Sequence, residues 1–180
     1  MMYFAYGIDL DASTLMEWTR DNSLPVPART LVGPASLDNH RLAFPIYSEA
    51  WQGGVADVAP QAGKSVAGVL FDVSERTLKL LDGFFGSKYR RVKIVATLYR
   101  GHMPVEAVTY QSTVHDVRPF PPSESYIDRL AAGAYAFGLS ALWIMQVQSF
   151  ARNQPAISGV SLRWEQAPDL GDLVFAPPAA

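Results

Sequence analysis

The stretch Arg91-Val92-Lys93-Ile94-Val95-Ala96-Thr97-Leu98-Tyr99 decides the fold class, because it is the cleanest strand in the chain. Its even-numbered positions are all apolar, and most of its odd-numbered positions carry polar or amphipathic side chains. A period of two predicts a β-strand with one face on a core. Gly101-His102 follows as a turn, and the residues from Pro104 to Gln111 are typical of the returning strand of a hairpin.

Further strands precede this hairpin, and helices lie toward both ends of the chain. Strands are expected at 2–6, over 31–44 with a break at Gly33-Pro34, at 55–58 with an end at Pro60, and at 69–73. Helices are expected at 12–21, from Ser74 past Leu81, from Ser123 to about Leu130, and, after a separation at Gly133, through a long uncharged stretch. This order predicts an α+β domain with a small curved sheet or barrel and helices packed outside it.

Composition narrows the class of protein. The 180 residues suit one domain, with 49% hydrophobic and 18% charged residues. A net charge of −2 argues against a protein that grips nucleic acid through phosphates. Because cysteine is absent and the three histidines are scattered, we expect neither a metal site nor a cofactor.

The sequence also favours a cytoplasmic protein. The N-terminal residues lack the basic start and the apolar run of a signal peptide. The stretch between Arg129 and Arg152 holds no charge, but it is poor in the strongly apolar residues that drive membrane insertion. We therefore expect a buried helix there and no membrane partner.

Three motif fragments do not complete a catalytic pattern. Gly63-Lys64-Ser65 would end a phosphate-binding loop, but Val58 stands where its first glycine is needed. Gly159-Val160-Ser161 would begin a nucleophile elbow, but Arg163 takes the closing glycine position. His115-Asp116 is a lone pair without a serine context. No side-chain nucleophile is predicted.

Five landmarks follow one another in a fixed order. They are Tyr3 to Leu10 (YFAYGIDL), Leu37 to Ala56 with Gly53-Gly54, Pro60 to Leu70, Leu81 to Arg91 (LDGFFGSKYRR), and Pro122 to Tyr126 followed by Gly133 to Leu139. Together they resemble the γ-glutamylcyclotransferase-like family, which includes the AIG2-like proteins, from about Met2 to Trp143. In that family the first landmark contains Y-G-S-N-L, the fourth L-D-x-x-E-G and the fifth P-S-x-x-Y.

The resemblance implies a fold and a reaction. The fold is a small mixed-strand β-barrel with a cavity at one end, over residues 1–152, with residues 153–180 as a C-terminal extension. The reaction converts a γ-glutamyl amine into 5-oxoproline and a free amine. The substrate's own α-amine attacks its γ-carbonyl, so the protein holds the substrate folded back on itself. One carboxyl group moves the proton.

This chain departs from the family pattern at three positions in the two segments that would line the site. Phe85 occupies the position of the family's catalytic glutamate, and a phenylalanine cannot carry a proton. Ile8 stands where the family has serine, and Asp9 where it has asparagine. Loss of a general acid–base group costs about 10²–10⁴ in rate.

Two interpretations follow. In the first, the chain is a pseudoenzyme that keeps the scaffold as a non-catalytic small-molecule-binding or protein-interaction domain. In the second, another carboxyl group has replaced the glutamate, and the chain is an active cyclotransferase. Asp9 is the first candidate for that acid–base group, with a helix cap shared with Asp11 as its alternative role. Asp82 is the second, with a surface role at a helix end as its alternative.

The resemblance also implies a substrate-binding set. Its members in this sequence are Tyr6, Gly7, Ile8, Asp9, Leu10, Tyr89 and Tyr126. Backbone N–H groups of the first loop would hold the substrate's oxygens. The alternative for the three tyrosines is a core ring whose hydroxyl binds the backbone. The expected partner is a small molecule, and a γ-glutamyl compound is the class that the resemblance implies.

Overall fold

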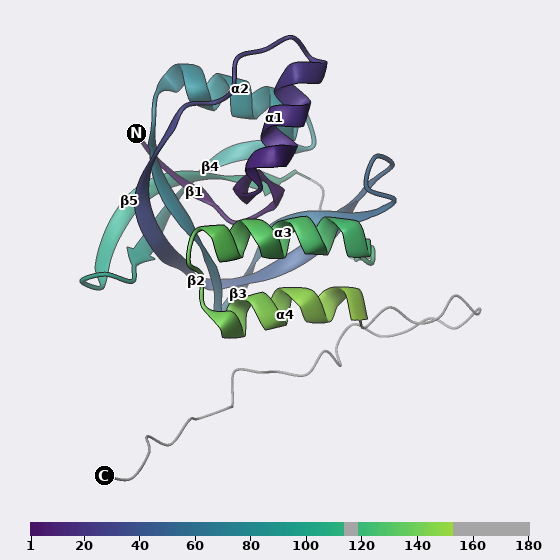
Figure 1. Cartoon of the computed structure of the whole chain (residues 1–180). Coiled ribbons are helices and arrows are strands. Elements are labelled where there is room, and N and C mark those ends of the chain that lie inside the picture. Colours follow the sequence, from purple (N-terminus) through teal and green to yellow (C-terminus); the bar gives the residue numbers. More distant parts are fainter. Residues whose placement is uncertain (114–118, 153–180) are drawn as a thin grey trace.

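The computed structural model describes residues 1–113 and 119–152. Within these ranges, strands form a closed barrel in the order β1-β3-β2-β4-β5 (Figure 1). The strands are β1 (Met2–Ala5), β2 (Arg29–Ser48), β3 (Gly53–Val73), β4 (Tyr89–Leu98) and β5 (Met103–Ser112). Neighbours pair antiparallel except β1 and β5, which pair parallel. The mixed-strand barrel predicted from the sequence is confirmed.

Helices cover one end and one side of this barrel. They are the 3₁₀ helix η1 (Ile8–Leu10), α1 (Ala12–Asp21), α2 (Glu75–Phe85), α3 (Glu124–Ala136) and α4 (Ala141–Arg152). Side chains at Asp11, Ser74 and Ser123 accept hydrogen bonds that cap the starts of α1, α2 and α3. In Figure 1, α1 and α2 lie together at the top of the barrel, and α3 and α4 run side by side across its front.

The long hairpin of β2 and β3 differs from the shorter strands expected there. Neither Gly33-Pro34 nor Pro60 interrupts a strand, because the partner strand continues past each of them. Instead the register shifts near these positions, and Asn39, opposite this part of β3, has a positive φ of 57°. Bulges of this kind admit a proline into a strand by removing the local need for an N–H donor.

The boundary between the last two helices also differs from the expectation. Gly133 lies inside α3, and the break falls at Gly138, whose φ of 71° ends the helix. Gly133 is required for a different reason. A Cβ atom there would lie 2.7 Å from the backbone carbon of Leu10, so only glycine lets α3 pack against η1 at this distance.

Short ladders close the barrel. β1 meets β5 at Tyr3 and Val108, and the Thr109 hydroxyl donates to the Phe4 carbonyl oxygen at 2.8 Å. β2 meets β4 through Ala35–Leu98 and Ser36–Thr97. The core therefore joins the first strand to residues more than a hundred positions later.

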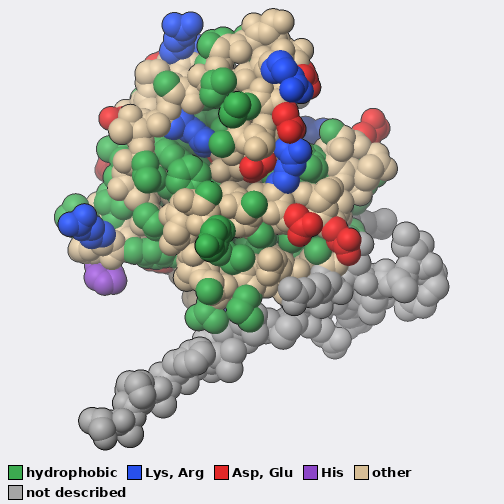
Figure 2. All heavy atoms as spheres, in the orientation of Figure 1, with side chains coloured by type: hydrophobic (Ala, Val, Ile, Leu, Met, Phe, Trp, Pro, Cys, Tyr) green, Lys and Arg blue, Asp and Glu red, His purple; other side chains and the backbone are tan. Residues whose placement is uncertain are grey.

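In the described part of the chain, no helix is both long and apolar enough to cross a bilayer. On the face shown in Figure 2, hydrophobic side chains are scattered over α3 and α4. Tyr135, Leu142 and Met145 are exposed members of these two helices. The expected extension 153–180 lies outside the described residues.

Candidate functional site

The loop from Tyr6 to Leu10 connects β1 to α1 and is buried throughout. The Leu10 N–H donates to the Gly7 carbonyl oxygen at 3.0 Å and closes the η1 turn. The Gly7 N–H donates to Asp9 Oδ1 at 3.2 Å, and the Ile8 side chain packs in the core. These contacts fix the backbone turn, and the side chains of the loop are buried in the interior.

Asp9 has no exposed area, and its carboxylate faces inward. The Tyr3 hydroxyl donates to Asp9 Oδ2 at 2.6 Å, while Arg29 donates to the Asp9 carbonyl oxygen at 2.6 Å. Burial raises the pKa of Asp9, and the Tyr3 hydrogen bond and the Arg29 charge counter only part of that rise. The helix cap belongs to Asp11 alone; Asp9 ties the loop to Tyr3 instead.

Ala56 in β3 joins two of the predicted tyrosines. The Ala56 N–H donates to the Tyr126 hydroxyl oxygen at 2.8 Å, and the Tyr89 hydroxyl donates to the Ala56 carbonyl oxygen at 2.8 Å. Burial raises the pKa of both phenols. The N–H groups of Ala56 and Ile8 counter part of the rise for Tyr126.

The third predicted tyrosine reaches across the barrel. The Tyr6 hydroxyl donates to the Tyr110 carbonyl oxygen in β5 at 2.6 Å. Burial raises its pKa well above the usual value, and the charge of Asp57 adds to the rise. In all three tyrosines the hydroxyl binds a backbone group, which fixes the walls of the site.

Phe85, at the end of α2, lies among aromatic rings. Its ring stacks on Tyr110 with 4.2 Å between centroids and 14° between planes. It also contacts the rings of Tyr89 and Phe84, each at 5.3 Å. Gly86, with a φ of 68°, then turns the chain into β4. The end of α2 therefore contacts Tyr110, whose backbone carbonyl oxygen accepts the hydrogen bond from Tyr6 of the loop.

Asp82 lies on the outer side of this aromatic group. Arg91 donates to Asp82 Oδ1 at 2.6 Å and also reaches Glu75, and the Tyr110 hydroxyl donates to Asp82 at 2.7 Å. Burial works to raise the pKa of Asp82, but the hydrogen bonds from Arg91 and Tyr110 outweigh it and hold the pKa below its usual value. Asp82 is thus held as an ionised partner of Arg91.

Asp57 is a buried carboxylic acid at the site that the sequence analysis missed. Its side chain accepts the Ser112 N–H at 2.9 Å, and the residue is 5% exposed. In the sequence, Asp57 is a single acid between apolar residues of a predicted strand. Because aspartate is rarely buried in such a strand, this position was the signal that could have identified it. Asp57 directly follows the Gly53-Gly54-Val55-Ala56 run, which ends the second landmark.

A separate groove of about 270 Å³ opens where β4 diverges from β2. Its lining residues are Leu37, Asp38, His40, Val58, Pro60, Val92, Lys93, Ile94, Val95 and Gln111. None of the predicted site residues is among them. In the described ranges, no three His, Asp or Glu side chains gather in the way that metal ligands do.

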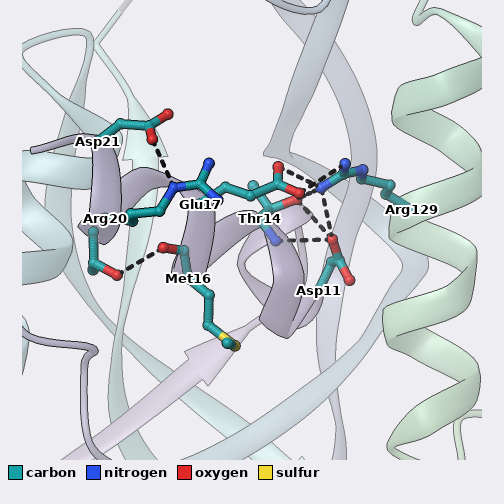
Figure 3. A network of polar contacts seen from close by, with 8 residues as sticks. Asp11, Thr14, Met16, Glu17, Arg20, Asp21 and Arg129 are labelled. Atoms are coloured by element: carbon teal, nitrogen blue, oxygen red, sulfur yellow. Dashed lines mark hydrogen bonds and ion pairs between the residues drawn. The ribbon is translucent and has the colours of Figure 1, made fainter.

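An ion-pair network links α3 to the start of α1, directly after the Tyr6–Leu10 loop. Arg129 of α3 donates to Glu17 at 2.8 Å and to the Thr14 hydroxyl at 3.2 Å (Figure 3). It also lies 3.5 Å from Asp11, and Asp11 in turn caps α1 through Thr14. The network fastens α3 to the start of α1, so the loop between β1 and α1 is fixed at both ends.

Comparisons with known proteins agree with this architecture. A sequence model of the family described as "Gamma-glutamyl cyclotransferase, AIG2-like" matches residues 3–128. A γ-glutamylcyclotransferase from Bos taurus is 27% identical over 159 residues, which cover 84% of this chain and 79% of the bovine protein.

Solved structures show the same fold. A structure described as γ-glutamyl cyclotransferase has a TM-score of 0.70 at 23% identity, covering 92% of this chain and 94% of its own. An uncharacterized protein from Homo sapiens has a TM-score of 0.70 at 24% identity, covering 91% and 94%.

Proposed function

The chain belongs to the γ-glutamyl cyclotransferase, AIG2-like family, and from this premise we propose that it binds small γ-glutamyl compounds at the Tyr6–Leu10 loop with an impaired cyclisation step. In the family reaction, the α-amine of the γ-glutamyl group attacks its own γ-carbonyl and expels an amine. The protein contributes a folded substrate geometry and one proton carrier. The first contribution depends on the loop, and the second on the residue at position 85.

The loop supports the binding part of the proposal. The Tyr6–Leu10 turn is fastened to β5 by the Tyr6 hydroxyl, to β2 by Arg29, and to α3 by the close approach of Gly133 to Leu10, as a preorganised binding loop requires. Tyr89 and Tyr126 both bind the backbone of Ala56 in β3: Tyr126 accepts from its N–H, and Tyr89 donates to its carbonyl oxygen. Ordered walls of this kind lower the entropy cost of holding a substrate in one conformation.

The position of Phe85 carries the impairment part. Its ring stacks on Tyr110 beside the wall formed by Tyr89, where the resemblance puts a carboxyl group. A hydrocarbon ring offers no proton to the leaving amine. The cyclisation rate should therefore be lower by roughly 10²–10⁴-fold, which is the contribution of one acid–base group.

Substitution at position 85 tests this proposal. The variant Phe85→Glu should release 5-oxoproline from γ-glutamyl amines roughly 10²–10⁴ times faster than the wild-type protein. Phe85→Gln, which has the same shape without an ionisable group, should not. Each protein is assayed for 5-oxoproline over a panel of γ-glutamyl compounds, with circular dichroism as the check on folding. Equal rates for the Glu and Gln variants would contradict the proposal.

A non-catalytic interaction domain is the second candidate, and one observation favours it. The Gly7 N–H, a backbone donor that the resemblance assigns to the substrate, is bonded to Asp9 in this structure. Thermal unfolding with the same compounds separates the candidates. A ligand at about 100 times its Kd adds about 2.7 kcal/mol of stability. Absence of any shift, together with no turnover by Phe85→Glu, would favour the interaction domain.

A further inference from the structure

Five aromatic rings from four elements contact one another around position 85. The Phe85 ring stacks on Tyr110 of β5 with 4.2 Å between centroids. The rings of Phe84 and Tyr89 each lie 5.3 Å from the Phe85 ring, and Trp18 of α1 meets Phe84 at 5.5 Å. Tyr110 is buried, whereas the other four residues are only partly buried, so ring surface remains for a ligand to cover. We call this set the aromatic wall: Trp18, Phe84, Phe85, Tyr89 and Tyr110.

The aromatic wall is fixed in place and joined to the loop. The Tyr110 hydroxyl donates to Asp82 at 2.7 Å, and the Tyr89 hydroxyl donates to a backbone carbonyl oxygen of β3 at 2.8 Å. The Tyr110 ring also meets the ring of Tyr3 with 5.9 Å between centroids, and the Tyr3 hydroxyl donates to Asp9 of the loop at 2.6 Å. Because these rings are held before a ligand arrives, the wall can bind one without a large ordering cost.

The chemistry of the aromatic wall is that of ring faces and ring edges. Within residues 1–113 and 119–152, the cation–π contacts lie at Phe71 and Trp51 and not at the wall. The carboxylate of Asp82, which the Tyr110 hydroxyl meets, is paired with Arg91. A surface of this kind favours an aromatic ligand group, because ring pairs about 4.5–7 Å apart attract each other beyond the effect of their buried area.

The family reaction decides which part of a substrate meets this wall. There the acid–base group at position 85 returns a proton to the leaving nitrogen, so the side chain at that position lies beside the amine part of the bound substrate. In this chain the side chain is the Phe85 ring. The glutamyl part is the same in every substrate of the class. A ring at position 85 therefore acts on the choice of the amine.

We propose that the aromatic wall selects γ-glutamyl derivatives of amines that carry an aromatic ring, and that Phe85 is the residue that determines this specificity. The inference rests on the proposed function, because it concerns the same loop and the same substrate class. One replacement, a ring in place of a carboxyl group, then both removes the proton carrier and creates a subsite for an aromatic amine. A ring with a packing role alone would leave the choice of ligand unchanged.

Two amides with rings of similar size test the preference. Isothermal titration calorimetry gives the Kd of the wild-type protein for γ-glutamyl phenethylamide and for γ-glutamyl cyclohexylethylamide, whose ring is saturated. Because an aromatic pair strengthens binding by about 2–12-fold beyond its buried area, the phenethylamide should bind more tightly by that factor. Equal Kd values for the two amides would overturn the inference.

Leucine at position 85 tests whether Phe85 is responsible. Phe85→Leu keeps an apolar side chain but removes the ring, so the two Kd values should become equal. Phe137→Leu is the matched control, because Phe137 is also a partly buried ring and packs on Phe71 instead of the aromatic wall. It should keep the wild-type ratio of Kd values, and an unchanged ratio in Phe85→Leu would contradict the role of Phe85. If Phe85→Leu does not fold, Phe85→Glu gives the same comparison, since it also lacks the ring.

The proposed function and this inference fail differently. Binding of both amides with equal Kd values would overturn the aromatic preference and leave the proposed function standing. Tighter binding of the phenethylamide, with no turnover of either amide by Phe85→Glu, would overturn the impaired cyclisation and leave the aromatic subsite in place. No binding of either amide would overturn both.

Discussion

Single residues at the site are held by partners far away in the sequence. Ala56 bonds Tyr126 through its N–H and Tyr89 through its carbonyl oxygen, and Tyr6 reaches Tyr110 over 104 positions. None of these partnerships follows from local pattern, because a tyrosine in a strand or helix does not reveal which backbone group its hydroxyl meets. The landmarks single out Tyr6, Tyr89 and Tyr126, and only the fold supplies the partners of their hydroxyls.

Asp57 was missed for the same reason, because its partner lies far away in the sequence. A charged residue within a strand is ordinarily read as solvent-facing. In the structure Asp57 accepts the Ser112 N–H of β5 and is almost fully buried. Asp9 illustrates the reverse case: the preference of aspartate for helix starts predicts a cap, whereas its carboxylate accepts hydrogen bonds from Tyr3 and Gly7.

Asparagine at position 9 gives a prediction at this scale. The raised pKa of Asp9 means that the unfolded chain releases its proton at lower pH than the folded one. The free energy of unfolding should therefore fall as the pH rises above the ordinary aspartate pKa of 3.8. Asp9→Asn lacks this loss, so its stability relative to the wild-type protein should increase from about pH 4 to about pH 7. Urea unfolding at both pH values measures the difference, and a constant or decreasing difference would contradict the prediction.

Helices and strands were predictable where a local signal and the fold agree. The alternating pattern of β4 and the capping serines of α2 and α3 led to correct elements. Local signals misled at Pro60 and at Gly133, where a paired strand and a close helix contact override the intrinsic tendency to break structure.

Alanine at Gly133 gives a prediction at the scale of elements. Alanine is ordinarily the better helix former by up to about 1 kcal/mol. At this position the new Cβ would lie 2.7 Å from the backbone of Leu10, and overpacking costs about 1–3 kcal/mol. Gly133→Ala should therefore lower the free energy of unfolding and shift the loop away from α3.

The matched control is Gly83→Ala in α2. There the new Cβ would meet only the Trp18 ring, at 3.4 Å, so the substitution should be neutral or stabilising in urea unfolding. Equal changes in the free energy of unfolding for the two substitutions would show that the close packing of α3 against η1 does not require glycine at position 133.

At the scale of the whole molecule, the barrel depends on two short closures. The fold class followed from strands in the middle and helices at the ends, and the barrel from the family resemblance. The closure itself could not be predicted, because it joins β1 to β5 through one parallel bridge and the Thr109 hydroxyl. No pattern within either strand specifies a partner at that distance.

Valine at Thr109 tests this closure. The substitution keeps the shape of the side chain and removes its buried hydrogen bond to Phe4. A hydrogen bond of this kind contributes about 0.5–1.5 kcal/mol, so the free energy of unfolding should fall by that amount. Thr30→Val, at an exposed position of β2, should change it by less than about 0.5 kcal/mol. If both substitutions changed the free energy of unfolding equally, the Thr109 hydrogen bond would not contribute to closing the barrel.

The contact between Tyr6 and Tyr110 has a kinetic consequence. Joining residues 104 positions apart requires closing a long loop of chain, and such contacts form slowly. The hairpins of β2–β3 and β4–β5 can assemble from neighbouring residues, whereas the contact between the Tyr6–Leu10 loop and β5 forms after the hairpin that contains β5. We therefore expect the loop to be completed at a late stage of folding, so that a compound bound at the proposed site would stabilise only the fully folded protein.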